Sequence, residues 1–379
     1  MTKNLVELSH LVLERFRGSD GQPVRGRLVS PNDLPSEIES LKNVERLSAW
    51  DSSTGRRILE FRYGGAYCVA VTFGISDAGK ETIATITDDR LSVIEIPGSV
   101  YLYLAWALKL QPTRNEAEWV EQYIAGPATT EGVDLDTIKA SLEDITVFSV
   151  SDISMFRVTV PGTYIPNYLC TFDPMLEVHT QLTDRSICII REMFLHEKES
   201  LIERNIFQAM ATPIAKHAFL EIYRLLEFVF VLPRTRALLE CLKLAGGTLD
   251  MRLLDFARHC NQQLGWKRVE RDSLERLFKE YAISNYSAFR CVVERCKPFS
   301  GLTVPEGTSI PEERTAFVSR FVEIYYQLRN QVAHQLWPDE ERDCSDIDWQ
   351  HLSEFTLDCI AFLYRQHLSK EVTMLVGAF

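Results

Sequence analysis

The chain lacks the long apolar run that a membrane-spanning helix needs. A span requires about 20 consecutive apolar residues, and the best run, Ile94 to Leu108, is interrupted by Glu95 and Pro97. The first apolar stretch contains Glu7 and Glu14, so it does not have the pattern of a secretory signal. We therefore expect a cytoplasmic protein that makes no contact with membranes.

Paired cysteines and the common catalytic motifs are also missing. The nine cysteines are spread over 379 residues without a Cys-x-x-Cys pair, which predicts free thiols rather than a disulfide framework or a structural zinc site. The sequence contains no phosphate-binding loop, dinucleotide-binding fingerprint, zinc-protease motif, serine-hydrolase elbow or kinase signature. We accordingly predict no metal and no cofactor.

Positive charge is scarce overall and unevenly placed. The net charge is −12, and residues 1–200 carry 19 basic and 29 acidic side chains, whereas residues 201–299 carry 16 and 11. The acidic surplus argues against a general nucleic-acid coat protein. The local basic surplus fits either a phosphate-binding surface or an ordinary solvated face.

The length and the apolar fraction of 46% predict two domains with real cores. The first half has the rhythm of strands, and Gly64-Gly65 predicts a tight hairpin. Strands are predicted at 57–63, 67–73, 82–87, 91–96, 146–150 and 155–160, and helices at 4–16, 114–125 and 134–142. Residues 1–200 should therefore form an acidic α+β domain with a mostly antiparallel sheet.

From about residue 186 the apolar spacing becomes helical. Helices are predicted over 187–207, 215–231, 235–244, 248–264, 273–281, 287–296, 312–334 and 345–368. Residues 201–379 should therefore form an all-α domain.

One short motif in this region has chemical meaning. The predicted 312–334 helix ends in Arg-Asn-Gln-Val-Ala-His, with Arg329, Asn330 and His334. RNA can be cut without a metal when its 2′-hydroxyl attacks the adjacent phosphate. That reaction needs a proton carrier near neutral pH, the role of His334, and a cation on the phosphate oxygens, the role of Arg329. Asn330 precedes His334 by four residues on one helix face, where it can orient the imidazole or bind phosphate.

The spacing leaves the geometry of such a site open. Arg329 and His334 lie about 140° apart on a continuous helix, from five steps at the helical period. Either the helix ends between them, or two copies of the chain form a composite site. Two further matches to the Arg-to-His spacing, Arg191/His196 and Arg252/His259, are interpreted as chance pairs on helix surfaces.

This motif and its helical context resemble the HEPN superfamily, from about residue 200 to the C-terminus. The resemblance implies an all-α HEPN-like bundle and a metal-independent endoribonuclease acting on RNA. It also implies a homodimer whose two motifs face each other, and a role as a toxin or an effector of antiviral (phage) defence. The N-terminal domain would then restrain or target the nuclease in response to a protein or ligand trigger. Gln335 stands where family members often have glycine.

A second interpretation assigns the motif no chemistry. Arg329 would form a surface ion pair with Glu323 or Asp339, and His334 would cap the C-terminus of its helix. The helical domain would then be a non-catalytic HEPN-like dimerisation or adaptor module that binds a protein partner.

Overall fold

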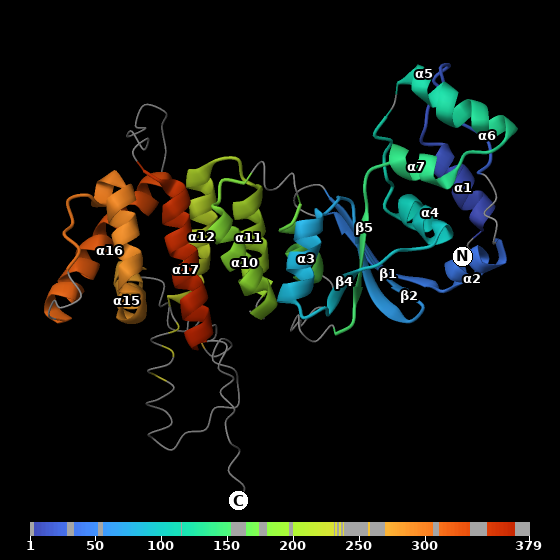
Figure 1. Ribbon diagram of the computed structural model, residues 1–379. Coiled ribbons are helices and arrows are strands. Elements are labelled where there is room, and N and C mark those ends of the chain that lie inside the picture. The colour runs from blue at the N-terminus through green and yellow to red at the C-terminus, as the bar shows by residue number, and fades with distance from the viewer. Residues whose placement is uncertain are drawn as a thin grey trace, which may run out of the picture. The chain divides into compact units, whose positions relative to one another are not determined.

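The computed structural model describes most of the chain (Figure 1). It describes residues 4–28, 34–51, 56–114, 116–152, 164–173, 180–196, 200–230, 270–305, 311–333 and 347–367, together with residues 232, 235, 238 and 257. The chain divides into two compact units, Met1–Val178 and His179–Phe379. The boundary that we predicted from the sequence, residue 200, lies further along the chain.

The first unit combines helices with one sheet. Its helices are α1 (Leu5–Leu13), α2 (Leu34–Lys42), α3 (Asp77–Ile86), α4 (Gly98–Ala107), α5 (Ala117–Val120), a π-helical turn (Glu121–Ala125), α6 (Gly126–Thr130), α7 (Leu135–Ser141) and α8 (Tyr164–Cys170). Its strands are β1 (Val44–Asp51), β2 (Arg57–Tyr63), β3 (Ala66–Val71), β4 (Leu91–Val93) and β5 (Thr146–Val150).

The five strands form a sheet in the order β1-β2-β3-β5-β4, and every neighbouring pair is antiparallel. This confirms the α+β class and the antiparallel sheet predicted for this part of the chain. Gly64 and Gly65 join β2 to β3 with positive φ angles of 57° and 85°, the backbone that a tight hairpin requires. The hairpin predicted from the two glycines is therefore confirmed.

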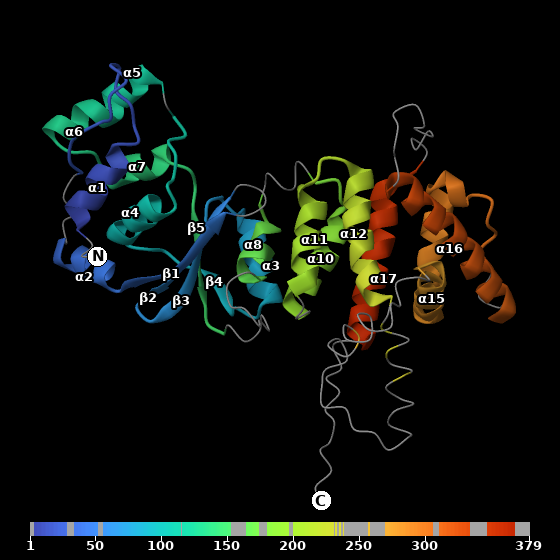
Figure 2. The ribbon, with the colours of Figure 1, turned by 180° about the vertical axis from the view of Figure 1, so that it is seen from behind.

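Helices lie on both sides of this sheet, with α1, α4 and α7 on one side and α3 and α8 on the other (Figures 1 and 2). Leu59 and Phe61 of β2 belong to the main core, which also contains side chains of α1 and α4. Their strand neighbours Ile58 and Glu60, which point to the other face, are buried as well. Burial on both faces explains why β2 and β3 contain consecutive apolar residues instead of a clean alternation.

The strand predicted at 82–87 is wrong, because residues 82–86 belong to helix α3 and Thr87 is its C-cap. Ser76 caps this helix by accepting a hydrogen bond from the backbone N–H of Gly79 at 3.1 Å. The negative charge of Asp77, in the first turn, stabilises the helix by its interaction with the positive end of the helix dipole. Only Ile83 of the helix is buried. The alternating Thr and Ile residues therefore do not mark a half-buried strand.

Other differences in this unit concern elements that the sequence did not signal. β1 and α4 were not predicted, and α4 is buried on all sides from Gly98 to Ala105, so it has no polar face to reveal a helical period. The strand predicted at 155–160 lies outside the described residues.

The regular secondary structure in the described residues of the second unit is all helical. Its helices are α10 (Asp184–His196), α11 (Ser200–Ala211), α12 (Ala215–Val229), α15 (Glu270–Arg295), a short 3₁₀ turn (Lys297–Phe299), α16 (Pro311–Ala333) and α17 (Trp349–His367). The two helices predicted at 273–281 and 287–296 correspond to the two helical segments of α15, which meet at a kink where Asn285 has non-helical backbone angles. Of the helix predicted at 187–207, residues 187–196 lie in α10 and residues 200–207 lie in α11, and residues 197–199 lie outside the described residues. The helices predicted at 235–244 and 248–264 fall almost wholly outside the described residues.

An aromatic cluster holds α15, α16 and α17 together. Phe278 and Phe289 of α15 contact Phe321 of α16 and Phe355 of α17, with ring centroids 4.9 to 6.0 Å apart. Most of these rings meet edge to face, the geometry that aromatic quadrupoles favour. None of the described helices, in either unit, is long and apolar enough to cross a membrane.

Candidate functional site

Two of the three predicted site residues, Arg329 and Asn330, lie near the end of α16. His334 lies outside the described residues. Helix α16 continues without a break from Arg329 to Ala333, the residue just before His334. The structure therefore shows no helix end there that would bring Arg329 and His334 together within one copy of the chain.

The apolar face of α16 determines where Arg329 points. Phe321, Tyr325, Leu328 and Val332 are buried, at the three- and four-residue spacing of a core-facing stripe. The hydroxyl of Tyr325 is 2.6 Å from that of Thr356 on α17, which fixes the helix at this level. Arg329 follows Leu328 directly, so it leaves the helix at the border between this stripe and solvent.

Arg329 is held by two carboxylates from two other helices. Its Nη2 lies 2.5 Å from Oε1 of Glu227, at the end of α12, and 3.2 Å from Oε1 of Glu270, at the start of α15. The guanidinium carbon also lies 5.1 Å from the centre of the Tyr223 ring, a distance at which cation–π attraction acts. Only 19% of the Arg329 side chain is exposed.

Glu270 extends this cluster to two tyrosines. Its Oε1 accepts a hydrogen bond from the Tyr223 hydroxyl at 3.2 Å, and its Oε2 accepts one from the Tyr326 hydroxyl at 3.4 Å. The carboxylate thus joins α12, α15 and α16 at one point. Burial is the main cause that raises the pKa of Tyr223, so this hydroxyl remains protonated and donates.

Asn330 completes the hydrogen bonds of the arginine. Arg329 Nη1 donates to Asn330 Oδ1 at 3.0 Å. Asn330 is half-buried and lies one helical turn before the position of His334. The structure therefore brings Arg329 and Asn330 together, with the asparagine oriented by the arginine.

The charges in this cluster shift the pKa of its members. Burial raises the pKa of Glu227, and the hydrogen bond from Arg329 offsets this only in part. Burial alone would lower the pKa of Arg329, but the hydrogen bond to Glu227 and the charge of Glu270 raise it above its ordinary value. With both carboxylates ionised, the cluster has one more negative than positive charge, which disfavours a further anion.

Among the described residues, Arg329 pairs with Glu227 and Glu270 and not with Glu323, one of the two partners that the second interpretation named. Glu323 lies 3.9 Å from Arg271 instead, and Asp339 lies outside the described residues. Of the two chance matches, Arg191 and His196 both lie on α10, and Arg252 and His259 lie outside the described residues.

The structure brings together another arginine and histidine, which sequence reasoning missed. At the start of α17, Nδ1 of His351 lies 2.7 Å from Oδ2 of Asp348, and its Nε2 contacts Nη1 of Arg295 at the end of α15. Asp348 also caps α17, because its Oδ1 accepts from the backbone N–H of His351 at 3.1 Å. An Asp three residues before a His signals a cap, but nothing in the sequence pairs residue 351 with residue 295.

Comparisons with protein families, with curated proteins and with solved structures found no match to this chain. Its function must therefore be inferred from the residues and their geometry. The HEPN resemblance of the second unit stays a prediction from the motif and its helical setting.

Proposed function

We propose that the helical unit is a HEPN-like bundle and a metal-independent endoribonuclease, with Arg329, Asn330 and His334 as its catalytic residues. The observation that supports this proposal is the fixed position of Arg329. It is the residue of the motif that must grip a phosphate, and it is oriented from three sides by Glu227, Glu270 and the Tyr223 ring. Orientation of this kind lowers the entropic cost of phosphate binding.

Each residue has a distinct role in the proposed reaction. His334 removes the proton from the 2′-hydroxyl or delivers one to the leaving oxygen. The 2′-oxygen bonds to phosphorus, the bond to the 5′-oxygen breaks, and the products carry a 2′,3′-cyclic phosphate and a 5′-hydroxyl. Arg329 stabilises the charge that develops on the phosphorane oxygens, and Asn330 holds Arg329 through its side-chain oxygen.

On this proposal, the arrangement in which two carboxylates hold Arg329 is a resting one. A phosphate that binds Arg329 must replace Glu227 or Glu270, because Nη2 is already engaged by both. We propose that this exchange occurs in a homodimer, where His334 of the second copy approaches Arg329, and that the acidic first unit regulates it. On this proposal the protein acts in the cytoplasm as a toxin or a phage-defence effector.

The test uses the full-length protein incubated with total RNA, with and without EDTA. We expect cleavage that persists in EDTA and fragments that end in 2′,3′-cyclic phosphate or 3′-phosphate. His334→Ala should lower the rate by about 100- to 10,000-fold, the contribution of general acid–base catalysis. His196→Ala and His259→Ala, the matched controls from the chance pairs, should stay within a few-fold of wild type. Ends that carry 5′-phosphate and disappear with EDTA would contradict the proposal.

A second candidate function is favoured by the same ion pairs. Because Arg329 ties α12, α15 and α16 together through Glu227 and Glu270, its role is then structural, in a non-catalytic adaptor that binds a protein partner. This candidate predicts that Arg329→Ala destabilises the helical unit, while RNA stays intact with wild type and every variant. The adaptor function would be excluded if the wild-type protein cleaved RNA and a folded His334→Ala variant did not.

A further inference from the structure

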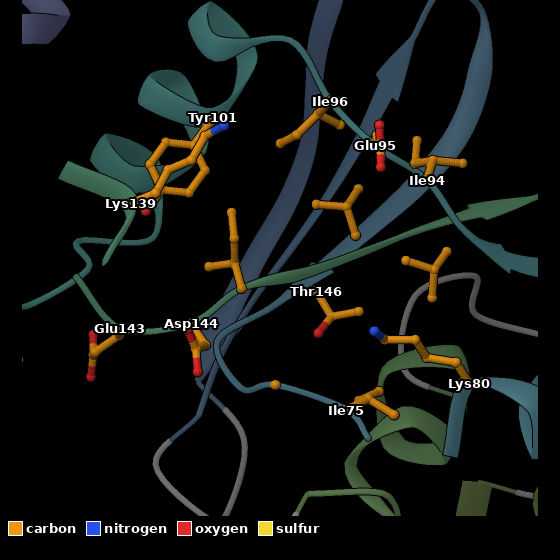
Figure 3. A pocket seen from close by; sticks show the side chains of 14 residues that line it. Ile75, Lys80, Ile94, Glu95, Ile96, Tyr101, Lys139, Glu143, Asp144 and Thr146 are labelled. Carbon is orange, nitrogen blue, oxygen red and sulfur yellow. The ribbon is translucent and has the colours of Figure 1, made fainter. Parts of the chain in front are cut away.

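The first unit contains a pocket that the proposed function does not use. Its volume is 610 Å³, within the range of ligand-binding clefts. The pocket opens where β4 and β5 separate. The backbone N–H of Ile94 still donates to the carbonyl of Val147 at 2.9 Å, and the chain then departs through Pro97 into α4. Figure 3 shows β5 crossing the pocket, with Ile94 and Ile96 on one side and Ile75 on the other.

Aliphatic side chains line part of this pocket, and charged side chains line the rest. The apolar side chains along it are Ile75, Val93, Ile94, Ile96, Ile145 and Val147. Several remain partly in contact with solvent, and Val93 is 40% exposed. Covering these side chains with an apolar ligand would be favourable by about 25 cal/mol for each Å² removed from water.

Opposite charges lie on the two sides of the pocket. Lys80 of α3 points toward Thr146 from one side, whereas Asp144 lies on the other side of Thr146 (Figure 3). Lys80 pairs with Asp77 at 2.8 Å, but the Asp77 side chain is 94% exposed. Such a pair is weak in water, so Lys80 can exchange it for a ligand anion.

Asp144 and Glu95 are the two carboxylates of the pocket for which the described residues show no hydrogen bond or ion pair, and Asp144 is the one that lies across Thr146 from Lys80. Its neighbour Glu143 accepts hydrogen bonds from Arg57 and from the backbone N–H of Gln111. Lys139, on the same side, lies 5.7 Å from the centre of the Tyr101 ring and 3.5 Å from Asp136. No hydrogen bond or ion pair of the Asp144 side chain is found among the described residues, and its carboxylate lies beside Gly74, where a Cβ would be 3.4 Å from Oδ2.

The backbone beside Asp144 is available too. β5 begins to pair at Thr146, and the backbone N–H of Glu143 donates to the carbonyl of Gln111 at 3.0 Å. Between them, no backbone hydrogen bond of Asp144 or Ile145 is found in the described part of the chain. An extended chain entering the pocket would therefore meet main-chain donors and acceptors that continue the ladder of β5.

We propose that this pocket binds a short, extended peptide of apolar residues with free ends, its ammonium group at Asp144 and its carboxylate at Lys80. The aliphatic walls receive the side chains, and the start of β5 pairs with the peptide backbone. A tripeptide, about 10 Å long when extended, is the length we choose as a probe. A phosphate-bearing ligand is disfavoured, because Asp144 and Glu143 would repel it at one end.

The experiment measures binding of trivaline to the full-length protein by calorimetry. Two blocked forms, N-acetyl-trivaline and trivaline amide, remove the ammonium and the carboxylate in turn. We expect free trivaline to bind and each blocked form to bind at least about tenfold more weakly, the size of a lost charged hydrogen bond. If trivaline fails to bind at millimolar concentration, or if the blocked forms bind equally well, the proposal is overturned.

Variants connect each end of the peptide to its residue. Asp144→Asn should weaken the binding of free trivaline about tenfold and leave the binding of N-acetyl-trivaline unchanged. Lys80→Gln should weaken the binding of free trivaline about tenfold and leave the binding of trivaline amide unchanged. The controls Asp88→Asn and Lys42→Gln alter exposed ion-paired residues outside the pocket and should have no effect. Equal losses in the control variants would show that binding lies elsewhere, and circular dichroism verifies that each variant is folded.

Discussion

Arg329 on α16 reaches Glu227 on α12, with its Nη2 2.5 Å from the carboxylate Oε1. The two residues are 102 positions apart in the sequence. Their contact neutralises the one cation of the motif that could bind a phosphate. The same contact fixes that cation in place, so it determines both how the site is oriented and what must change before an anion can bind.

The first prediction concerns how Glu227 couples stability to pH. Burial raises the pKa of this carboxyl above its usual 4.5. A raised pKa means that its stabilising contribution is complete below about pH 4.5 and is lost as the pH rises through the folded value. The free energy of unfolding of wild type, relative to Glu227→Gln, should therefore fall as the pH rises through this window. Urea denaturation at a series of pH values measures it.

A control with the opposite sign lies in the same unit. Hydrogen bonds from Lys279 and then Ser319 to the Glu275 carboxylate lower the pKa of Glu275. The stability of wild type relative to Glu275→Gln should therefore fall as the pH drops below about 4.5, the usual value. If the stability differences for Glu227→Gln and Glu275→Gln changed with pH in the same direction, the pH effect would not come from these carboxylates.

The second prediction concerns the release of Arg329. If the carboxylates restrain an active ribonuclease, Glu227→Gln should raise the cleavage rate about tenfold, because a charged hydrogen bond to the guanidinium contributes about 1.5–3 kcal/mol. Glu323→Gln is the matched control, since this half-exposed carboxylate on α16 lies near Arg271 rather than Arg329. Arg329→Lys should not restore full activity, because an ammonium cannot hold two phosphate oxygens in a fork. A slower Glu227→Gln variant would mean that Glu227 positions Arg329 for catalysis.

Local signals predicted much of the first unit. The hairpin followed from Gly64-Gly65, and strand-forming residues marked β2 and β3 on either side of it and β5 further along the chain. The secondary-structure prediction failed where the local sequence pattern did not reflect how the segment packs in the fold. Alternating Thr and Ile residues suggested a strand at 82–87, but the cap at Ser76 starts a helix there, and α4 hid its period because it is buried on all sides.

The candidate site was predictable only as a list of residue types. The sequence indicated Arg329 and Asn330 through their spacing to His334, and the amphipathic pattern placed them on a helix. It could not indicate Glu227 or Glu270 as the partners of Arg329, because these contacts depend on how α12, α15 and α16 pack. Long-range ion pairs of this kind have no periodic signature in the sequence.

The third prediction concerns assembly. Because α16 continues to Ala333, no break in the helix before that residue brings the motif together, and we propose a site that combines Arg329 of one copy with His334 of another. We expect light scattering of the full-length protein at tens of micromolar to give a mass of two chains. Mixing inactive Arg329→Ala with inactive His334→Ala should then restore part of the activity, since a mixed dimer contains one intact pair. A strict monomer that cleaves RNA would rule out the composite site.

The last prediction concerns a buried ion pair in the first unit. Arg56, just before β2, donates from Nε and Nη2 to Asp173 at 2.7 and 3.0 Å, and the Asp173 side chain is fully buried. Arg56→Ala would leave this carboxylate buried without the guanidinium, a loss that costs about 3–5 kcal/mol. Arg62→Ala is the control, because Arg62 and Glu45 are 55% and 64% exposed and such surface pairs contribute at most about 1 kcal/mol. Hydrogen exchange of the β2 amides reports the stability of this unit separately, and equal protection in both variants would show that the buried pair does not stabilise the fold.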